Sequence, residues 1–214
     1  MAWLLRGGRS GQVRLKLLLS MHLIAVRGDH DVTRSPASWA RMLDLPDPDK
    51  NGARRVRDAT SWLKENKLIR VERVGGTEPR VYLLSALGDG AAYVRPSSAS
   101  RYLRVPVEFW SSGWIVTLSG TALAMWLVIT DLPGGTESSA GVWTPPIVAR
   151  RRYRLSEDTF TKGIAELESH GLVKVTKQPQ GEDQWLYNRL RNSYRLNNER
   201  LGDAPGSPIR PSTD

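Results

Sequence analysis

The two halves of the sequence predict the same order of elements, and this repetition is the strongest constraint on the fold. Apolar residues at helical spacing, Ser-Pro or Thr-Pro helix starts and alternating strands define the order in each half. The first half predicts three helices and a two-stranded hairpin, over residues 12–27, 36–43, 53–65, 68–74 and 80–84. The second half predicts the same elements over residues 121–132, 145–152, 157–170, 172–177 and 191–196.

The two halves also match residue by residue at two places. Residues 63–71 read Leu-x4-Leu-Ile-Arg-Val, and residues 167–175 read Leu-x4-Leu-Val-Lys-Val. Residues 35–41 read Ser-Pro-x3-Ala-Arg, and residues 144–150 read Thr-Pro-x3-Ala-Arg. Because the matches fall at equivalent elements in the same order, they indicate two copies of one module.

This order of elements, with Leu-x4-Leu-Ile-x-Val leading into the hairpin, resembles the winged helix-turn-helix superfamily. The resemblance implies an α+β fold, mainly α, of two tandem winged helix-turn-helix domains, each with three helices and a β-hairpin wing. We expect a first domain at residues 1–84, a linker at 85–101, a second domain at 102–201 and a disordered tail at 202–214.

The charge of the chain favours a polyanionic partner, either nucleic acid or an anionic membrane. The formal net charge is +9, and residues 1–100 hold 17 Lys and Arg against 10 Asp and Glu, whereas residues 101–214 hold 14 against 12. Of the 31 basic residues 24 are Arg, whose planar guanidinium suits phosphate and guanine. A GC-rich genome would also raise the Arg share, but it would not explain the net charge.

The residue inventory argues against an enzyme and against a bound cofactor or metal. The chain has no Cys and 3 His, and it has no Gly-rich phosphate loop that ends in Lys-Ser or Lys-Thr. Asp47, Asp49, Asn51 and Asp58 have the spacing of a calcium loop, but Arg residues within that loop would repel the ion. We therefore expect these acidic and polar residues to cap the next helix.

Two apolar segments could be mistaken for membrane signals. Residues 15–26 follow several cations as in a signal peptide, but they lack a cleavage motif of small residues. Residues 109–130 carry no charge, yet Ser-Ser-Gly at 111–113 predicts a turn, which leaves a buried helix over 121–132. We expect no membrane association and a cytoplasmic, nucleoid-associated protein.

The third helix of the first half is the expected site of base recognition. At about 100° per residue, Val56, Ala59, Thr60 and Leu63 form its core face. The exposed residues, which include those flanking the N-terminal end, are candidates for contacting bases and phosphates. These candidates are Lys50, Asn51, Arg54, Arg55, Arg57, Asp58 and Ser61. The alternative is a solvated face without a nucleic-acid partner.

The second half offers a basic cluster before its third helix and exposed residues on that helix. These candidates are Arg150, Arg151, Arg152 and Arg154, followed by Thr159, Thr161 and Lys162. Glu157 and Asp158 at the start of the helix would repel phosphate, so the cluster is expected to contact the DNA backbone. The strands and wings of both halves add candidate phosphate contacts, namely Arg73, Arg80, Lys174, Lys177, Arg189 and Arg191.

These features predict a protein that binds double-stranded DNA in a sequence-specific manner and regulates transcription. The second half reads Val105-Pro106-x3-Trp110 and Leu118-Ser119-x2-Ala122-Leu123 before its expected winged helix, and it is loosely similar to plasmid replication initiators of the RepA type, which bind origin repeats through winged helices. A winged-helix scaffold for protein interactions is the third alternative. Leu15, Leu19 and Leu23 add apolar surface to the first helix, so we expect it to pack on the second module or on a second copy in a homodimer.

Overall fold

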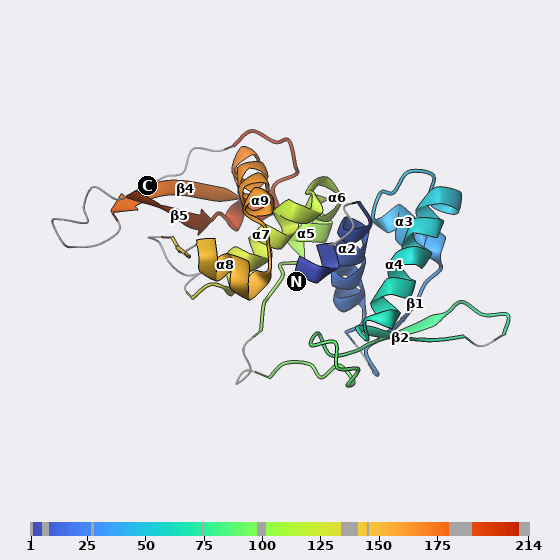
Figure 1. The fold of residues 1–214 in the computed structure, drawn as a ribbon. Helices are drawn as coiled ribbons and strands as arrows, with labels where there is room; N and C mark the ends of the chain where they lie inside the picture. The colour runs from blue at the N-terminus through green and yellow to red at the C-terminus, as the bar shows by residue number, and fades with distance from the viewer. Residues whose placement is uncertain are drawn as a thin grey trace. The chain divides into compact units, whose positions relative to one another are not determined.

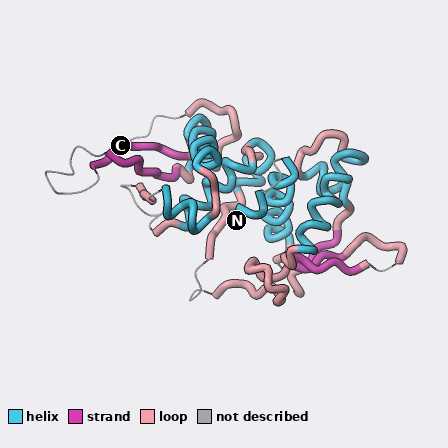
Figure 2. Tube along the Cα trace, in the orientation of Figure 1, coloured by secondary structure: helices cyan, strands magenta, loops and turns pink. Residues whose placement is uncertain are grey.

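The computed structural model describes residues 2–5, 9–26, 28–73, 75–97, 102–133, 141–144, 146–179 and 190–209. The chain divides into two compact units, Trp3–Tyr102 and Leu103–Asp214, the latter with Met1–Ala2. We call them the N-terminal and C-terminal units and describe each by itself (Figures 1 and 2). About 48% of the described residues are helix and 16% are strand, arranged in small antiparallel sheets, so the fold is α+β as predicted.

The N-terminal unit contains a cluster of three longer helices followed by a β-hairpin (Figure 1). Its helices are α1 (Ala2–Leu5), α2 (Arg9–Ile24), α3 (Pro36–Met42), the π-helical turn η1 (Pro48–Gly52) and α4 (Ala53–Glu65). Its strands are β1 (Asp31–Thr33), β2 (Ile69–Glu72) and β3 (Arg80–Leu83). The prediction missed β1, which is only three residues long, and placed both ends of α2 three residues too late.

The faces of α4 are those that its sequence predicts. Val56, Ala59 and Leu63 are buried against α2 and α3, whereas Thr60 is half-buried and donates its hydroxyl to the carbonyl of Val56. The opposite face, which carries Arg54, Asp58 and Ser61, is exposed. The sheet has the order β1-β3-β2, and Val81 at its centre pairs with a residue of each outer strand.

The sequence predicts that the Asp-rich loop caps α4, but Asp47 caps the turn η1 instead, and α4 follows Gly52 without a side-chain cap. Asp47 accepts hydrogen bonds from the backbone and the side-chain amide of Asn51, and Asp49 accepts one from Arg41. Among the described residues, no group of three or more His, Cys, Asp or Glu side chains is placed to hold a metal ion.

The first part of the expected linker folds back onto the N-terminal unit. Leu84 bridges to Ala92, and the Tyr93 backbone N–H donates to the Leu83 carbonyl. The Tyr93 ring lies edge-on to His22 and to His30, with ring centroids 5.0 Å apart in both cases. The module therefore extends beyond residue 84, because the chain continues to pair with β3 after the hairpin.

Stability of the N-terminal unit is expected to fall by about 2 kcal/mol between pH 7.5 and pH 5 because of His22. Burial, with a smaller contribution from the charge of His30, lowers the pKa of His22 from 6.5 to about 4. Between these values the unfolded chain binds more protons than the folded chain, so acid favours unfolding. Urea unfolding at both pH values measures the loss. His22→Phe, which keeps a ring beside Tyr93, is expected to remove it, and an unchanged pH dependence in this variant would refute the assignment.

The C-terminal unit has the element order of the N-terminal unit, with additional short helices at its start. Its helices are α5 (Glu108–Ser111), α6 (Trp114–Thr117), α7 (Gly120–Asp131), α8 (Pro146–Tyr153), α9 (Glu157–Ser169) and η2 (Glu199–Gly202). Its strands are β4 (Val173–Pro179) and β5 (Leu190–Leu196). Val142 bridges to Tyr194 of β5, and β5 pairs with β4, so the pairing order matches β1-β3-β2 of the N-terminal unit.

The uncharged segment over 109–130 is broken into separate helices. Gly113 has φ +87°, and Leu118 and Ser119 are extended, so α5, α6 and α7 cannot join. The Ser119 hydroxyl caps α7 by accepting from the Ala122 N–H. Among the described residues, no helix is both long and apolar enough to cross a lipid bilayer.

Close packing of α7 on α9 requires a glycine at position 163. A Cβ there would lie 2.8 Å from the Thr121 carbonyl oxygen and would also overlap the Met125 side chain. Gly163→Ala is therefore expected to destabilise the C-terminal unit by about 1–3 kcal/mol, although alanine is the better helix former. Urea unfolding measures this change. Ala165→Gly, on the exposed part of the same helix, isolates the propensity effect of about 1 kcal/mol, and a stabilised Gly163→Ala variant would contradict the packing argument.

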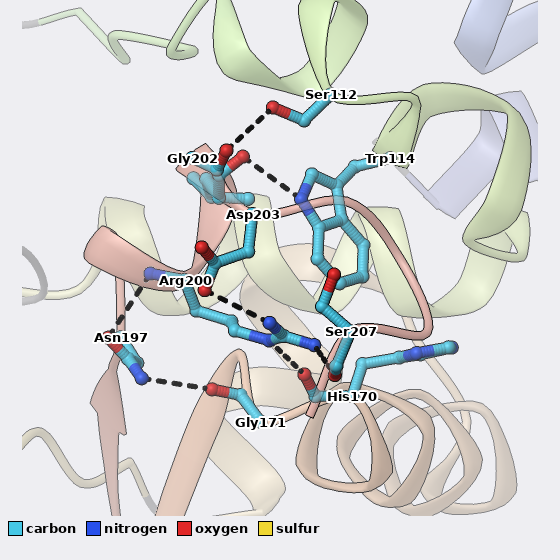
Figure 3. Close-up of polar contacts among 10 residues, drawn as sticks. Ser112, Trp114, His170, Gly171, Asn197, Arg200, Gly202, Asp203 and Ser207 are labelled. Atoms are coloured by element: carbon cyan, nitrogen blue, oxygen red, sulfur yellow. Dashed lines mark hydrogen bonds and ion pairs between the residues drawn. The ribbon is translucent and has the colours of Figure 1, made fainter. Parts of the chain in front are cut away.

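The chain after β5 packs on the C-terminal unit at least as far as residue 209, where we had expected a disordered tail from residue 202. The Leu201 carbonyl accepts a hydrogen bond from the Trp114 indole at 3.0 Å, and the Gly202 carbonyl accepts one from Ser112 (Figure 3). Arg200 is 4% exposed and bonds to the His170 and Ser207 carbonyls. Residues 199–209 lie against the end of α9, held by these hydrogen bonds and by Ile209 beside Gly171, and we call them the strap.

Candidate nucleic-acid interface

The exposed face of α4 and the turn before it carry the basic side chains of the candidate interface. Lys50, Arg54 and Arg57 are exposed, and no hydrogen bond or ion pair joins them to any described residue. Asn51 is also exposed, but its amide is engaged by Asp47. The three cations therefore lie close together along one helix and its lead-in, free to contact an external anion.

Arg55 lies apart from this set. It is half-buried, and it is seven residues before Trp62, so both lie on the same flank of α4. The guanidinium of Arg14 on α2 lies 4.4 Å from the centroid of the Trp62 ring, which places that flank beside α2. Arg57 occupies the other flank, which faces the hairpin, so the adjacent arginines 54, 55 and 57 have three different surroundings.

A groove with a volume of about 410 Å³ lies between α4, the hairpin and the start of α3. Its basic side chains are Arg34, Arg57, Lys64 and Arg73, all of them exposed and without a hydrogen bond or ion pair to a described residue. The sequence-based candidates included Arg57, Ser61 and Arg73 of this groove but missed Arg34 and Lys64. The signal for Lys64 was its position seven residues after Arg57, which places both on one helix flank.

The other cations of the hairpin are engaged within the unit. Arg80, a predicted phosphate contact, donates to both carboxylate oxygens of Asp31, at 2.6 and 3.1 Å. This hydrogen-bonded pair lowers the pKa of Asp31 and raises that of Arg80. The hydrogen bond from Tyr82, with a smaller effect of Arg70, lowers the pKa of Glu72. Arg80 therefore joins β3 to β1, and its guanidinium is already hydrogen-bonded to a carboxylate of the same unit.

Several predicted contacts in the C-terminal unit also have internal partners. Arg152 donates to Asp131 at 2.8 Å, and the same carboxylate oxygen accepts from the Tyr153 hydroxyl. Lys162 forms an ion pair with Asp158 one turn earlier, at 2.9 Å. The guanidinium of Arg191 lies 4.4 Å from the centroid of the Trp143 ring. These contacts reduce the number of cations that this unit presents freely.

The remaining candidates of the C-terminal unit are spread over several elements. Arg151, Arg154 and Lys177 are exposed, without a hydrogen bond or ion pair to a described residue. Three others are exposed or half-exposed: Thr161, Thr159, whose hydroxyl is hydrogen-bonded to Ser156, and Lys174, which has a partner within the chain. Arg150 belongs to α8, whose description there covers only the backbone, and Arg189 lies outside the described residues.

The two units thus differ in charge at α4 and α9, the helices that precede the hairpin in each unit. The exposed face of α4 has cations that no ion pair joins to a described residue, whereas α9 begins with exposed Glu157 and Asp158. No protein-family model matches this sequence, and no curated protein or solved structure matches it either.

Proposed function

We propose that this chain binds double-stranded DNA through two winged-helix modules and acts as a regulator of transcription. Two features support the winged-helix assignment, namely the order helix, strand, helix, helix, hairpin and the strand order β1-β3-β2 in the N-terminal unit. The C-terminal unit has the same order, with the Val142 bridge in place of β1. In such a module α4 would enter the major groove, with the hairpin as the wing.

The observation that carries the proposal is the group of unpaired cations on and beside α4. A carboxylate in an ion pair would weaken the attraction of these cations for phosphate, yet no ion pair joins Lys50, Arg54 or Arg57 to a described residue, although Asp58 lies on the same face as Arg54. Arg54 lies on the outermost face and is assigned to base edges, because a guanidinium can donate two hydrogen bonds to guanine. Lys50 and Arg57 flank it and are assigned to phosphates.

The C-terminal unit is assigned to the DNA backbone. Its exposed cations Arg151, Arg154 and Lys177 can neutralise phosphates, but the acidic start of α9 disfavours close approach to the bases. In this proposal the N-terminal unit selects the sequence and the C-terminal unit adds affinity.

Selection of bound duplexes from a random pool, followed by sequencing, tests the proposal and returns the preferred site. Recovery of one motif upstream of promoters is expected for a regulator of transcription. Repeated motifs clustered in one origin would instead identify a replication initiator. Failure to enrich any duplex would contradict DNA recognition and leave a protein-interaction scaffold.

Arg54→Ala is expected to weaken binding to the preferred site by about 1–3 kcal/mol and to relax base preference at one position. Arg151→Ala is the matched control, because it removes the same charge from an assigned contact to the DNA backbone. It should weaken binding to all duplex sequences evenly. Titrations of preferred and scrambled duplexes by fluorescence anisotropy measure both effects. Equal losses on the two duplexes for Arg54→Ala would assign base recognition to another residue.

A further inference from the structure

The groove between α4 and the hairpin has apolar walls in addition to its basic rim. Pro36, Val71 and Pro79 are half-buried and present apolar surface to it, and Trp39 and Val56 lie beneath. None of the described residues that line the groove is acidic. A DNA phosphate would use the basic rim, but its charged oxygens gain nothing from apolar walls.

The cations of the groove rim differ from the other hairpin cations, because no ion pair joins them to a described residue. Arg70 and Arg80 of the same hairpin are paired with Glu72 and Asp31. Arg34, Lys64 and Arg73 line the groove without any carboxylate partner among the described residues. Cations from three segments of the chain therefore converge on a shared space in which an anion would be the complementary group.

We infer that this groove binds a small organic anion with an apolar body, of the class of aryl carboxylates and aryl sulfonates. Its volume of about 410 Å³ is within the range of small-molecule sites. The apolar body would cover Val71 and the two prolines, while the anionic group would lie among the basic side chains. This occupant uses both kinds of surface that the groove presents, whereas inorganic phosphate uses only one.

The occupant would also compete with DNA, and this part of the inference rests on the proposed function. Arg57 and Ser61 belong both to the groove and to the DNA-facing side of α4. An anion held by Arg57 would neutralise a cation assigned to phosphate and would repel the DNA backbone. Such a ligand would release the protein from its site, because both ligands cannot use the same guanidinium at once.

Fluorescence titration of the 214-residue chain with 1-anilinonaphthalene-8-sulfonate tests the binding step. We expect one saturable site, weak displacement by sodium sulfate, and weaker binding of uncharged 1-anilinonaphthalene. Arg57→Gln/Lys64→Gln should weaken binding of the sulfonate by about tenfold. Lys67→Gln/Arg95→Gln removes two exposed charges of the same unit that lie outside the groove. This variant should bind the sulfonate with an affinity within about twofold of that of the parent chain.

Circular dichroism and urea unfolding verify that both double variants fold like the parent chain. Equal affinity of the parent and Arg57→Gln/Lys64→Gln chains for the sulfonate would overturn the inference. Sodium sulfate that displaced the bound sulfonate as well as free sulfonate does would overturn it too, because the site would then recognise only the charge. Absence of saturable binding to the folded parent chain would have the same consequence.

Titration with duplex DNA in the presence and absence of the sulfonate distinguishes this inference from the proposed function. Saturating sulfonate is expected to raise the apparent Kd of the parent chain for its preferred duplex by about tenfold. An unchanged Kd would overturn the competition, although DNA binding itself would stand. Conversely, groove-dependent sulfonate binding by a chain that binds no duplex would support the ligand site and contradict the proposed function.

Discussion

Raising the salt concentration from about 50 to about 200 mM is expected to weaken duplex DNA binding by about a thousandfold, with a log–log slope of about −5. Each phosphate that a Lys or Arg neutralises releases a condensed counterion, and about five or six such contacts produce this slope. The unpaired cations of both units supply enough groups, among them Lys50, Arg57, Arg73, Arg151 and Arg154. Fluorescence anisotropy titrations at four or more salt concentrations (on the order of tens to hundreds of millimolar) measure the slope.

Charge variants show which cations make the contacts. Arg57→Ala/Arg73→Ala should reduce the magnitude of the slope by about 2, since each phosphate contact contributes about 1. Lys67→Gln, an exposed position just after the C-terminal end of α4 and outside the lining of the groove, should leave the slope unchanged. A slope near zero with strong binding would rule out the phosphate contacts on which the proposed function depends.

Arg200→Ala is expected to lower the free energy of unfolding of the C-terminal unit by about 3–5 kcal/mol. The buried guanidinium donates to the His170 carbonyl at 3.2 Å, to the Asp203 carboxylate at 3.0 Å and to the Ser207 carbonyl at 2.5 Å (Figure 3). Its removal would leave three half-buried acceptors without that donor and would empty the buried space that the side chain fills. Urea unfolding monitored by circular dichroism measures the change.

Two variants control for charge and for side-chain size. Arg151→Ala removes an exposed arginine from the same unit and should change the free energy of unfolding by less than about 0.5 kcal/mol. Arg200→Lys retains the charge, but its single nitrogen cannot replace Nε, Nη1 and Nη2, which each donate to a different acceptor, so an intermediate loss is expected. If Arg200→Ala were as stable as Arg151→Ala, residues 199–209 would not depend on this arginine.

The positions of the main helices could be predicted from the sequence because their signals are local. The Ser35 and Ser156 hydroxyls cap α3 and α9 by accepting from backbone N–H groups three residues later, at 3.1 Å in both cases. The predicted span of α4, 53–65, is the observed one, since its apolar residues recur with the helical period over nearly four turns. The same periodicity determined which face of α4 is exposed.

The partners of the charged residues could not be predicted in this way. Arg80 meets Asp31 across 49 positions of sequence, and Arg152 meets Asp131 across 21. Nothing in the neighbourhood of either arginine indicates its partner, because strand pairing and helix packing bring the two groups together. The sequence therefore identified the cations of the chain but not which of them remain free.

Two larger features were likewise decided only by the tertiary structure. The sequence of residues 202–209 is polar and rich in Gly and Pro, which is typical of a disordered tail, yet Arg200, Trp114 and Ser112 hold the strap in place. The groove draws its lining from α2, α3, α4 and the hairpin, so no local pattern could reveal it. Helix limits and exposed faces follow from interactions within a few residues, which a sequence displays directly. Ion pairs, the strap and the groove depend on contacts between distant segments, which exist only once the chain has folded.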